Sequence, residues 1–308
     1  MKKPLEDITE ELRAALEKLK PKPDQIYTIH NNMRRLTNQF DTPGPDMERI
    51  RDFNVPHDEF PVPVRLYEPK TANDDVRTTL IYIHGGGFVT CSIQSHDGIC
   101  RRIADSAGCR VLSIEYRLAP QFPFPAGPDD CEHVLNWVMN GEAREYGINP
   151  ENIALGGDSA GGNMTAYLVQ KYRDRIKAQI LYYPLMQLVD VKPPNPGPQD
   201  ILQLGVMALK FIDQHYVKDA DTQDTRLSPL FEENLAGIPP TYLLTCELDP
   251  LRDEGRAYAD KLEAAGNLVT SYHAKALPHG FLNFGRAFKT ARKIPIDTAD
   301  FLREHMTA

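Results

Sequence analysis

Short apolar runs alternate with helical patterns from residue 60 onward. Val62, Val64 and Leu66 alternate with polar or small residues, which predicts a half-buried strand. Further buried strands are predicted over 79–83, 111–115, 152–155, 178–183, 241–246 and 268–273. Helical patterns lie between them, near 97–107, 129–140, 160–173, 253–265 and 287–305. This alternation predicts an α/β fold with a mainly parallel sheet and helices on both faces.

The first part of the chain has a different texture. Apolar residues recur at helical spacing and predict an amphipathic helix over 5–19, which Pro21 and Pro23 end. A second helix is expected over 24–39. We therefore expect residues 1–50 to form an N-terminal helical cap segment on a catalytic domain over 51–308.

One stretch interrupts the alternation of strands and helices. Residues 187–230 lie between two predicted strands and are too long for a plain connection. They contain a Pro/Gly cluster over 192–198 and a helical pattern over 202–217. We expect this insertion to form a lid, or the other half of a cap that the N-terminal helices complete.

Composition and charge exclude several classes of protein. The 308 residues carry a formal net charge of -8, with acidic and basic residues mixed throughout, so no surface for nucleic acid is expected. No apolar run approaches the length of a membrane span, and no signal peptide is visible. The five cysteines show no metal-binding spacing, which favours reduced thiols, no metal site and a cytoplasmic location.

The strongest chemical signal is Gly-Asp-Ser-Ala-Gly at 157–161. It follows a predicted strand and opens a predicted helix, the context that a nucleophile elbow requires. Such a motif is weak alone, and a structural glycine turn is the alternative. The strand–turn–helix context favours Ser159 as a nucleophile at the start of the helix.

A second glycine-rich element, His84-Gly85-Gly86-Gly87, follows the strand over 79–83. Acyl transfer places negative charge on a carbonyl oxygen, which backbone N–H groups stabilise best where glycine permits close approach. We assign the N–H groups of Gly86, Gly87 and Ala160 as the oxyanion hole. A loop without a ligand is the alternative for this element alone, but it is disfavoured by the elbow downstream.

The acid of a catalytic triad should follow the nucleophile in the chain. Asp249 lies just beyond the strand over 241–246, where a loop side chain can reach an imidazole. Glu247 and Asp253 are competitors, although Asp253 is also placed to favour the start of the next helix. Asp249 is the expected acid.

The base should be a histidine, which takes the proton of the serine while the acid holds its tautomer. Only His273, His279 and His305 follow Asp249. His273 falls within a predicted strand, and His305 lies near the C-terminus. His279 lies in a loop after the last strand and is the expected base.

These motifs together resemble one known family, the hormone-sensitive-lipase-like esterases, and within it the GDSAG subgroup of bacterial acetyl and carboxyl esterases. The resemblance covers residues 80–290 and rests on HGGGF (84–88), YRLAP (116–120), FPAGPDD (124–130), GDSAGGN (157–163), DPLRDEG (249–255) and PHGF (278–281). Gln121 departs from the family, which usually has Glu there, and this concerns local packing.

The resemblance implies an α/β-hydrolase fold with an eight-stranded twisted sheet and a helical cap. It implies Ser159, Asp249 and His279 as the triad, with His84, Gly85 and Asp158 supporting the motifs. Members typically hydrolyse short-chain acyl esters without a cofactor, as monomers or homodimers. We therefore expect a serine carboxylesterase that acts on a small ester and does not associate stably with membranes.

Three alternatives stay open at this point. The chain could be a non-catalytic ligand-binding protein on the same fold, as in the gibberellin-receptor relatives, but all three triad positions are filled. It could hydrolyse amides or lactones, because the triad sets acyl transfer and the pocket sets the substrate. It could also have a regulatory partner. Long-chain lipase activity is disfavoured, since no long apolar stretch predicts an interfacial surface.

Overall fold

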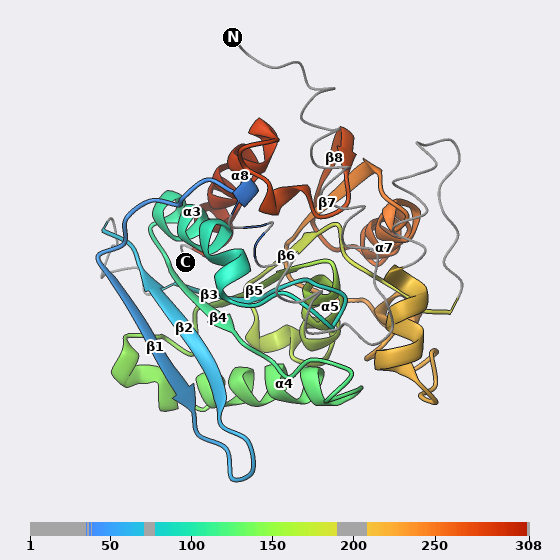
Figure 1. The fold of residues 1–308 in the computed structure, drawn as a ribbon, viewed down its shortest axis with the longest axis horizontal. Helices are drawn as coiled ribbons and strands as arrows, with labels where there is room; N and C mark the ends of the chain where they lie inside the picture. The colour runs from blue at the N-terminus through green and yellow to red at the C-terminus, as the bar shows by residue number, and fades with distance from the viewer. Residues whose placement is uncertain (1–34, 36, 38, 71–77, 190–207, 307–308) are drawn as a thin grey trace.

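A mixed eight-stranded sheet runs through the centre of the molecule (Figure 1). The computed structural model describes residues 35, 37, 39–70, 78–189 and 208–306. The strands are β1 (Arg49–Val55), β2 (Val62–Glu68), β3 (Thr79–Ile83), β4 (Arg110–Ile114), β5 (Ile153–Asp158), β6 (Ala178–Tyr182), β7 (Thr241–Leu248) and β8 (Val269–Pro278). Their order is β1-β2-β4-β3-β5-β6-β7-β8; the pairs β1–β2 and β2–β4 are antiparallel, and the other pairs are parallel. The predicted mainly parallel sheet is confirmed.

The strand that the sequence analysis missed is β1. Its residues RIRDFNV are largely polar, and only Val55 is buried. It lies at the edge of the sheet and pairs with β2 alone, so little of it needs to be apolar. Strand β1 includes residue 50, where the boundary between the cap segment and the catalytic domain was expected. The helix expected over 5–19 lies outside the described residues.

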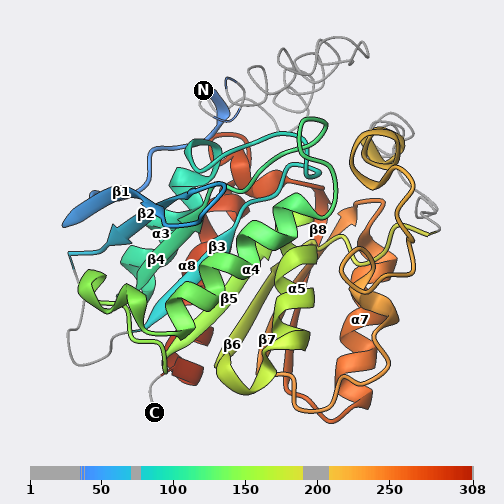
Figure 2. The same ribbon diagram turned by 90° about the horizontal axis from the view of Figure 1, so that it is seen from below.

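Helices cover both faces of the sheet, as predicted (Figure 2). Helices α3 (Asp97–Ala107) and α8 (Lys289–Met306) pack on one face. Helices α4 (Ala126–Met139), α5 (Ala160–Lys171) and α7 (Arg252–Ala264) pack on the other. Short 3-10 turns lie at Gln94–His96, Glu142–Tyr146, Arg173–Arg175, Pro229–Phe231 and Phe281–Asn283.

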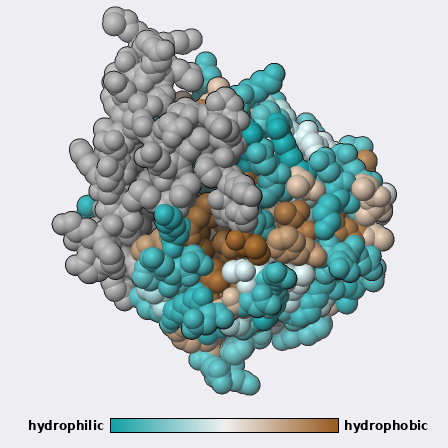
Figure 3. All heavy atoms as spheres, turned by 90° about the vertical axis from the view of Figure 1, so that its right-hand side faces the viewer, coloured by the Kyte–Doolittle hydropathy of each residue, from teal (hydrophilic) through white to brown (hydrophobic). Residues whose placement is uncertain are grey.

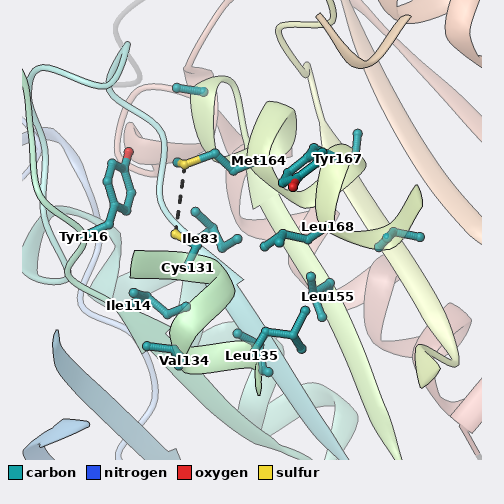
Figure 4. Close-up of a cluster of buried hydrophobic side chains, with 14 of the residues drawn as sticks. Ile83, Ile114, Tyr116, Cys131, Val134, Leu135, Leu155, Met164, Tyr167 and Leu168 are labelled. Atoms are coloured by element: carbon teal, nitrogen blue, oxygen red, sulfur yellow. Dashed lines mark hydrogen bonds between the residues drawn. The ribbon is translucent and has the colours of Figure 1, made fainter. Parts of the chain in front are cut away.

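Two hydrophobic cores result, because neighbouring side chains of a strand point to opposite faces. In β3, Ile81 and Ile83 belong to the core beneath α4 and α5, while Leu80 and Tyr82 belong to the core beneath α3 and α8. Figure 4 shows the first core, where Cys131 of α4 and Met164 of α5 meet through their sulfur atoms at 4.0 Å. A strand buried on both faces is continuously apolar, which is why β3 is easily predicted.

The structure describes two parts of the insertion between β6 and β7: its first residues 187–189 and its residues from 208 onward. Residues 208–212 are helical, followed by a π-helix at Asp213–Val217, so the predicted helical pattern is partly observed. The Pro/Gly cluster lies outside the described residues. The two ends of the insertion are joined: the Asn163 side-chain amide of α5 donates to the carbonyls of both Leu185 and Leu227 at 2.9 Å.

Figure 3 shows apolar residues gathered in the middle of one face, within hydrophilic surroundings. None of the described helices is long and apolar enough to cross a membrane. All five cysteines are buried free thiols.

Candidate active site

Ser159 lies at a sharp turn between β5 and α5. Its backbone has φ 53° and ψ −117°, a strained combination for a residue with a side chain. The turn is too tight for side chains at its neighbours: a Cβ on Gly157 would lie 2.5 Å from the backbone of Gly161, and one on Gly161 would lie 1.9 Å from the Ile83 carbonyl oxygen. The elbow predicted from the sequence is therefore present, with glycine required on both sides.

The structure brings the three predicted triad residues together. The Ser159 hydroxyl lies 2.8 Å from Nε2 of His279, and Nδ1 of His279 lies 2.8 Å from Oδ2 of Asp249. Asp249 is fully buried, and its other oxygen accepts the N–H of Leu251 at 2.8 Å. These distances suit proton transfer from the serine to a histidine whose tautomer the carboxylate holds.

The competing acids have other partners. One oxygen of Glu247 accepts the backbone N–H of Ala276 at 2.6 Å. Asp253 pairs with its neighbour Arg252 at 2.7 Å and lies in the first turn of α7. Of the three predicted candidates, Asp249 is the one that contacts His279.

The competing histidines also lie elsewhere. Nδ1 of His273, on β8, lies 3.0 Å from the Thr245 hydroxyl. The ring of His305 packs against Phe301 near the end of α8. His279, in the loop after β8, is the histidine that reaches Ser159.

Asp249 also raises the pKa of the His279 imidazole. Burial alone would lower the pKa of His279, but the Asp249 carboxylate and its hydrogen bond outweigh burial and raise the pKa above its ordinary 6.5. A histidine with a raised pKa is a stronger base and stabilises the imidazolium that forms when Ser159 loses its proton.

This electrostatic coupling predicts a pH dependence. His279 must be neutral to accept a proton, so kcat/KM is expected to fall as the pH drops through its raised pKa. Asp249→Asn removes the anion, so the remaining activity, reduced about 10⁴-fold, should have its acidic limb at lower pH. Rate profiles from pH 5 to 9 test this with the wild type as control; an unshifted limb in the variant would contradict the coupling.

The predicted oxyanion loop is tied to the residue before Ser159, because the Gly85 N–H donates to Asp158. Gly86 has φ 120°, and a Cβ there would lie 2.1 Å from the Thr90 carbonyl oxygen, while Gly87 has φ 62°. Ala160 is the first residue of α5, where N–H groups have no acceptor within the helix and the helix dipole favours negative charge. The loop and the helix start can together supply the donors that a developing oxyanion needs.

The supporting residues of the motifs have structural partners. The buried ring of His84 stacks on Tyr116 with centroids 4.4 Å apart, and the Tyr116 hydroxyl donates to the His84 carbonyl at 2.8 Å. The Gly85 N–H donates to the Asp158 carboxylate at 2.9 Å, which ties the oxyanion loop to the elbow. A Cβ on Gly85 would lie 2.5 Å from that carboxylate.

Sequence reasoning missed two buried acid–base groups beside the site. His96 contacts Asp158, and Glu254 accepts the N–H of Met186 at 2.5 Å and the side-chain amide of Gln187 at 3.1 Å. Burial raises the pKa of Glu254 to about 8. Glu254 belongs to the quoted DPLRDEG motif, so its position was available. Nothing near His96 in the sequence singles it out.

The comparisons with known proteins agree with this geometry. A family described by the alpha/beta hydrolase fold matches residues 80–283. Carboxylic ester hydrolase LipN of Mycobacterium tuberculosis is 34% identical over 272 residues, covering 84% of this chain and 71% of LipN. Esterase LipI of the same organism is 34% identical over 268 residues, covering 85% of this chain and 82% of LipI.

Solved structures agree as well. The ester-hydrolase EH1AB1 from the metagenome of Lake Arreo superposes with a TM-score of 0.87 at 31% identity, covering 100% of both chains. A hyperthermophilic esterase from the archaeon Pyrobaculum calidifontis has a TM-score of 0.87 at 30% identity, covering 99% of this chain and 98% of its own. This chain belongs to the hormone-sensitive-lipase-like esterases of the α/β-hydrolase fold. The predicted fold class and family are confirmed.

Proposed function

We propose that the protein hydrolyses carboxylic esters with short acyl groups, through an acyl-enzyme formed on Ser159. Its relatives are named carboxylic ester hydrolase and esterase, which supports the class of enzyme. The observation that carries the proposed site is the hydrogen-bonded chain from Ser159 through His279 to Asp249, with both links at 2.8 Å. Each residue follows a different strand of the sheet.

In the proposed reaction, the Ser159 oxygen attacks the ester carbonyl carbon while His279 takes the hydroxyl proton. Asp249 stabilises the imidazolium. The N–H groups of Gly86, Gly87 and Ala160 hold the oxyanion of the tetrahedral intermediate. His279 returns the proton to the leaving alcohol, and a water then repeats the sequence, which releases the carboxylic acid and restores Ser159.

Contacts of the insertion support a small acyl group. A Cβ on Gly87 would lie 3.1 Å from Ile212, and the ring of Phe88 stacks on Tyr216 with centroids 4.0 Å apart. Both Ile212 and Tyr216 are buried. The described part of the insertion therefore packs directly on the oxyanion loop, which limits the space beside it. In our proposal, residues 1–50 and 187–230 together form the cap.

A series of p-nitrophenyl esters tests the acyl preference. We expect the highest kcat/KM for acetate or butyrate and a steep fall toward decanoate, because longer chains meet the side chains packed on the loop. Ile212→Ala removes part of that wall and should shift the optimum toward longer chains. A wild-type optimum at decanoate or beyond would contradict the proposal.

The proposal also covers location and assembly. Five buried free thiols support a cytoplasmic location, since disulfides are rare in reducing compartments. We propose a monomer or homodimer without a cofactor. Labelling of Ser159 by a fluorophosphonate separates an enzyme from a binding protein on the same fold, because the reagent requires an activated serine.

A further inference from the structure

Directly behind the nucleophile lies a second, fully buried pair of acid and histidine. Asp158, the residue before Ser159, has a side chain that is 3% exposed, and that of His96 is 0% exposed. Nε2 of His96 is hydrogen-bonded to Oδ2 of Asp158 at 3.3 Å and lies 3.1 Å from Oδ1. Oδ1 accepts the hydroxyl of Tyr82 and the N–H of Gly85, both at 2.9 Å. The carboxylate thus joins the elbow, β3 and the oxyanion loop.

The contacts of His96 place acceptors beside both ring nitrogens. Nδ1 lies 2.9 Å from the Ser95 hydroxyl, whose hydrogen goes to the Ser92 carbonyl, and 3.4 Å from that carbonyl itself. Nε2 faces the Asp158 carboxylate, which can only accept. Nε2 must therefore carry a proton and donate it to Asp158.

Electrostatics support this protonation state. Burial alone would lower the pKa of His96, but the charge and hydrogen bond of Asp158 outweigh it and raise the pKa above 6.5. Asp41, from the loop before β1, acts in the same direction. In turn, His96 and its hydrogen bond help to keep the pKa of Asp158 below 3.8, against the effect of burial. The proton on Nε2 of His96 and the negative charge of Asp158 therefore stabilise each other.

His96 also contacts the loop that carries the catalytic base. Its Nε2 lies 3.3 Å from the side-chain amide of Asn283, four residues after His279. The oxygen of that amide is buried without a partner, and exchanging the two amide atoms would let the oxygen accept from Nε2. Through Asp158 and Asn283, His96 therefore touches the loops of the nucleophile, the oxyanion hole and the base.

We infer that His96 is a positioning residue for the oxyanion hole, acting through the hydrogen bond from its Nε2 to Asp158. This inference rests on the proposed function. His96 fixes the position of the Asp158 carboxylate, and this carboxylate holds the Gly85 N–H. The adjacent N–H groups of Gly86 and Gly87 therefore stay directed at the oxyanion. The hole acts mainly on the transition state, so loosening it should lower kcat and leave KM nearly unchanged.

Two amide substitutions at residue 96 distinguish the role of the Nε2 donor from the role of the side chain's volume. In His96→Gln the amide nitrogen can take the place of Nε2, whereas in His96→Asn it falls near the place of Nδ1 and cannot reach Asp158. We expect His96→Asn to lower kcat on p-nitrophenyl butyrate by about 100-fold, the scale of a catalytic group displaced by about 1 Å. His96→Gln should stay within about threefold of the wild type, and KM should change little in both.

A second readout follows the oxyanion itself. A trifluoromethyl ketone forms an adduct with the serine that bears an oxyanion, so its Ki should rise in His96→Asn by the same factor as kcat falls. His133→Asn is the matched control, because His133 lies on α4 with its Nε2 at 2.7 Å from the Pro56 carbonyl, outside the site. Thermal unfolding is recorded for every variant.

Three outcomes overturn the inference: wild-type kcat in His96→Asn, equal losses in folded His96→Asn and His96→Gln, or a loss confined to KM. If His96→Asn does not fold, Asp158→Asn takes its place. Its amide can still accept from Gly85 but can present N–H groups to His96, and wild-type kcat there would equally overturn the inference. Failure of the proposed function is a different result, since the wild type itself would then show no ester turnover.

Discussion

Ser159→Ala is expected to abolish ester hydrolysis, with a fall in kcat of about 10⁶-fold, as in other triad enzymes that lose the nucleophile. Without the hydroxyl no acyl-enzyme can form, and only the oxyanion hole and substrate binding still assist water. The fold should survive, because alanine retains the Cβ that Ser159 already places at φ 53°. Initial rates on p-nitrophenyl butyrate measure the loss of activity, and thermal unfolding measures whether the fold is retained.

A matched control distinguishes the nucleophile from any other serine. Ser271 lies exposed on β8. Ser271→Ala should therefore keep the wild-type rate and the wild-type labelling by a fluorophosphonate, whereas Ser159→Ala should lose both. Hydrolysis at the wild-type rate by Ser159→Ala would remove this serine from the mechanism.

His279→Asn is expected to produce a loss of comparable size, again about 10⁶-fold in kcat. Asparagine fills part of the space of the imidazole but cannot take the serine proton at neutral pH, so attack would require an unassisted hydroxyl. His279 contacts the buried Asp249 carboxylate through Nδ1, and the asparagine amide nitrogen falls near the place of that atom, so it can still donate to the carboxylate. The kinetic loss should therefore come with little change in thermal stability.

His273→Asn serves as the control for this second variant. His273, on β8, is hydrogen-bonded to Thr245 on β7, and its pKa is lowered, first by burial and then by nearby arginines. We expect this variant to hydrolyse esters within about threefold of the wild-type rate, the usual scale of a change outside the site. Full activity in His279→Asn with a large loss in His273→Asn would reverse the assignment of the base.

Much of the site could be predicted because its residues belong to short local patterns. A strand, a glycine-flanked serine and a helix within a few residues predicted the elbow at Ser159. The order of nucleophile, acid and base along the chain then selected Asp249 and His279. Parallel strands end at the same edge of a sheet, so residues that follow β5, β7 and β8 meet there.

Other features could not be predicted, because they depend on contacts between distant segments. Strand β1 is polar and is stabilised by pairing with β2 at the sheet edge. His96 stands 62 positions before Asp158 and has no motif around it. Burial raises the pKa of Glu254 to about 8 although the N–H of Met186 acts in the opposite direction, and that burial exists only because α7 packs against the segment after β6.

The sequence alone determined the class of fold and predicted the nucleophile and the order of its partners, because these depend on hydrophobic periodicity and on glycines at tight turns. The tertiary structure decided the contacts of these residues: it brings Asp249 to His279 and gives Glu247, Asp253 and His273 other partners, because distance depends on how the loops meet. It also decided that a buried His96 stands behind the oxyanion loop. Burial and partner charge set the proton affinities of these groups, and both arise only when the loops meet.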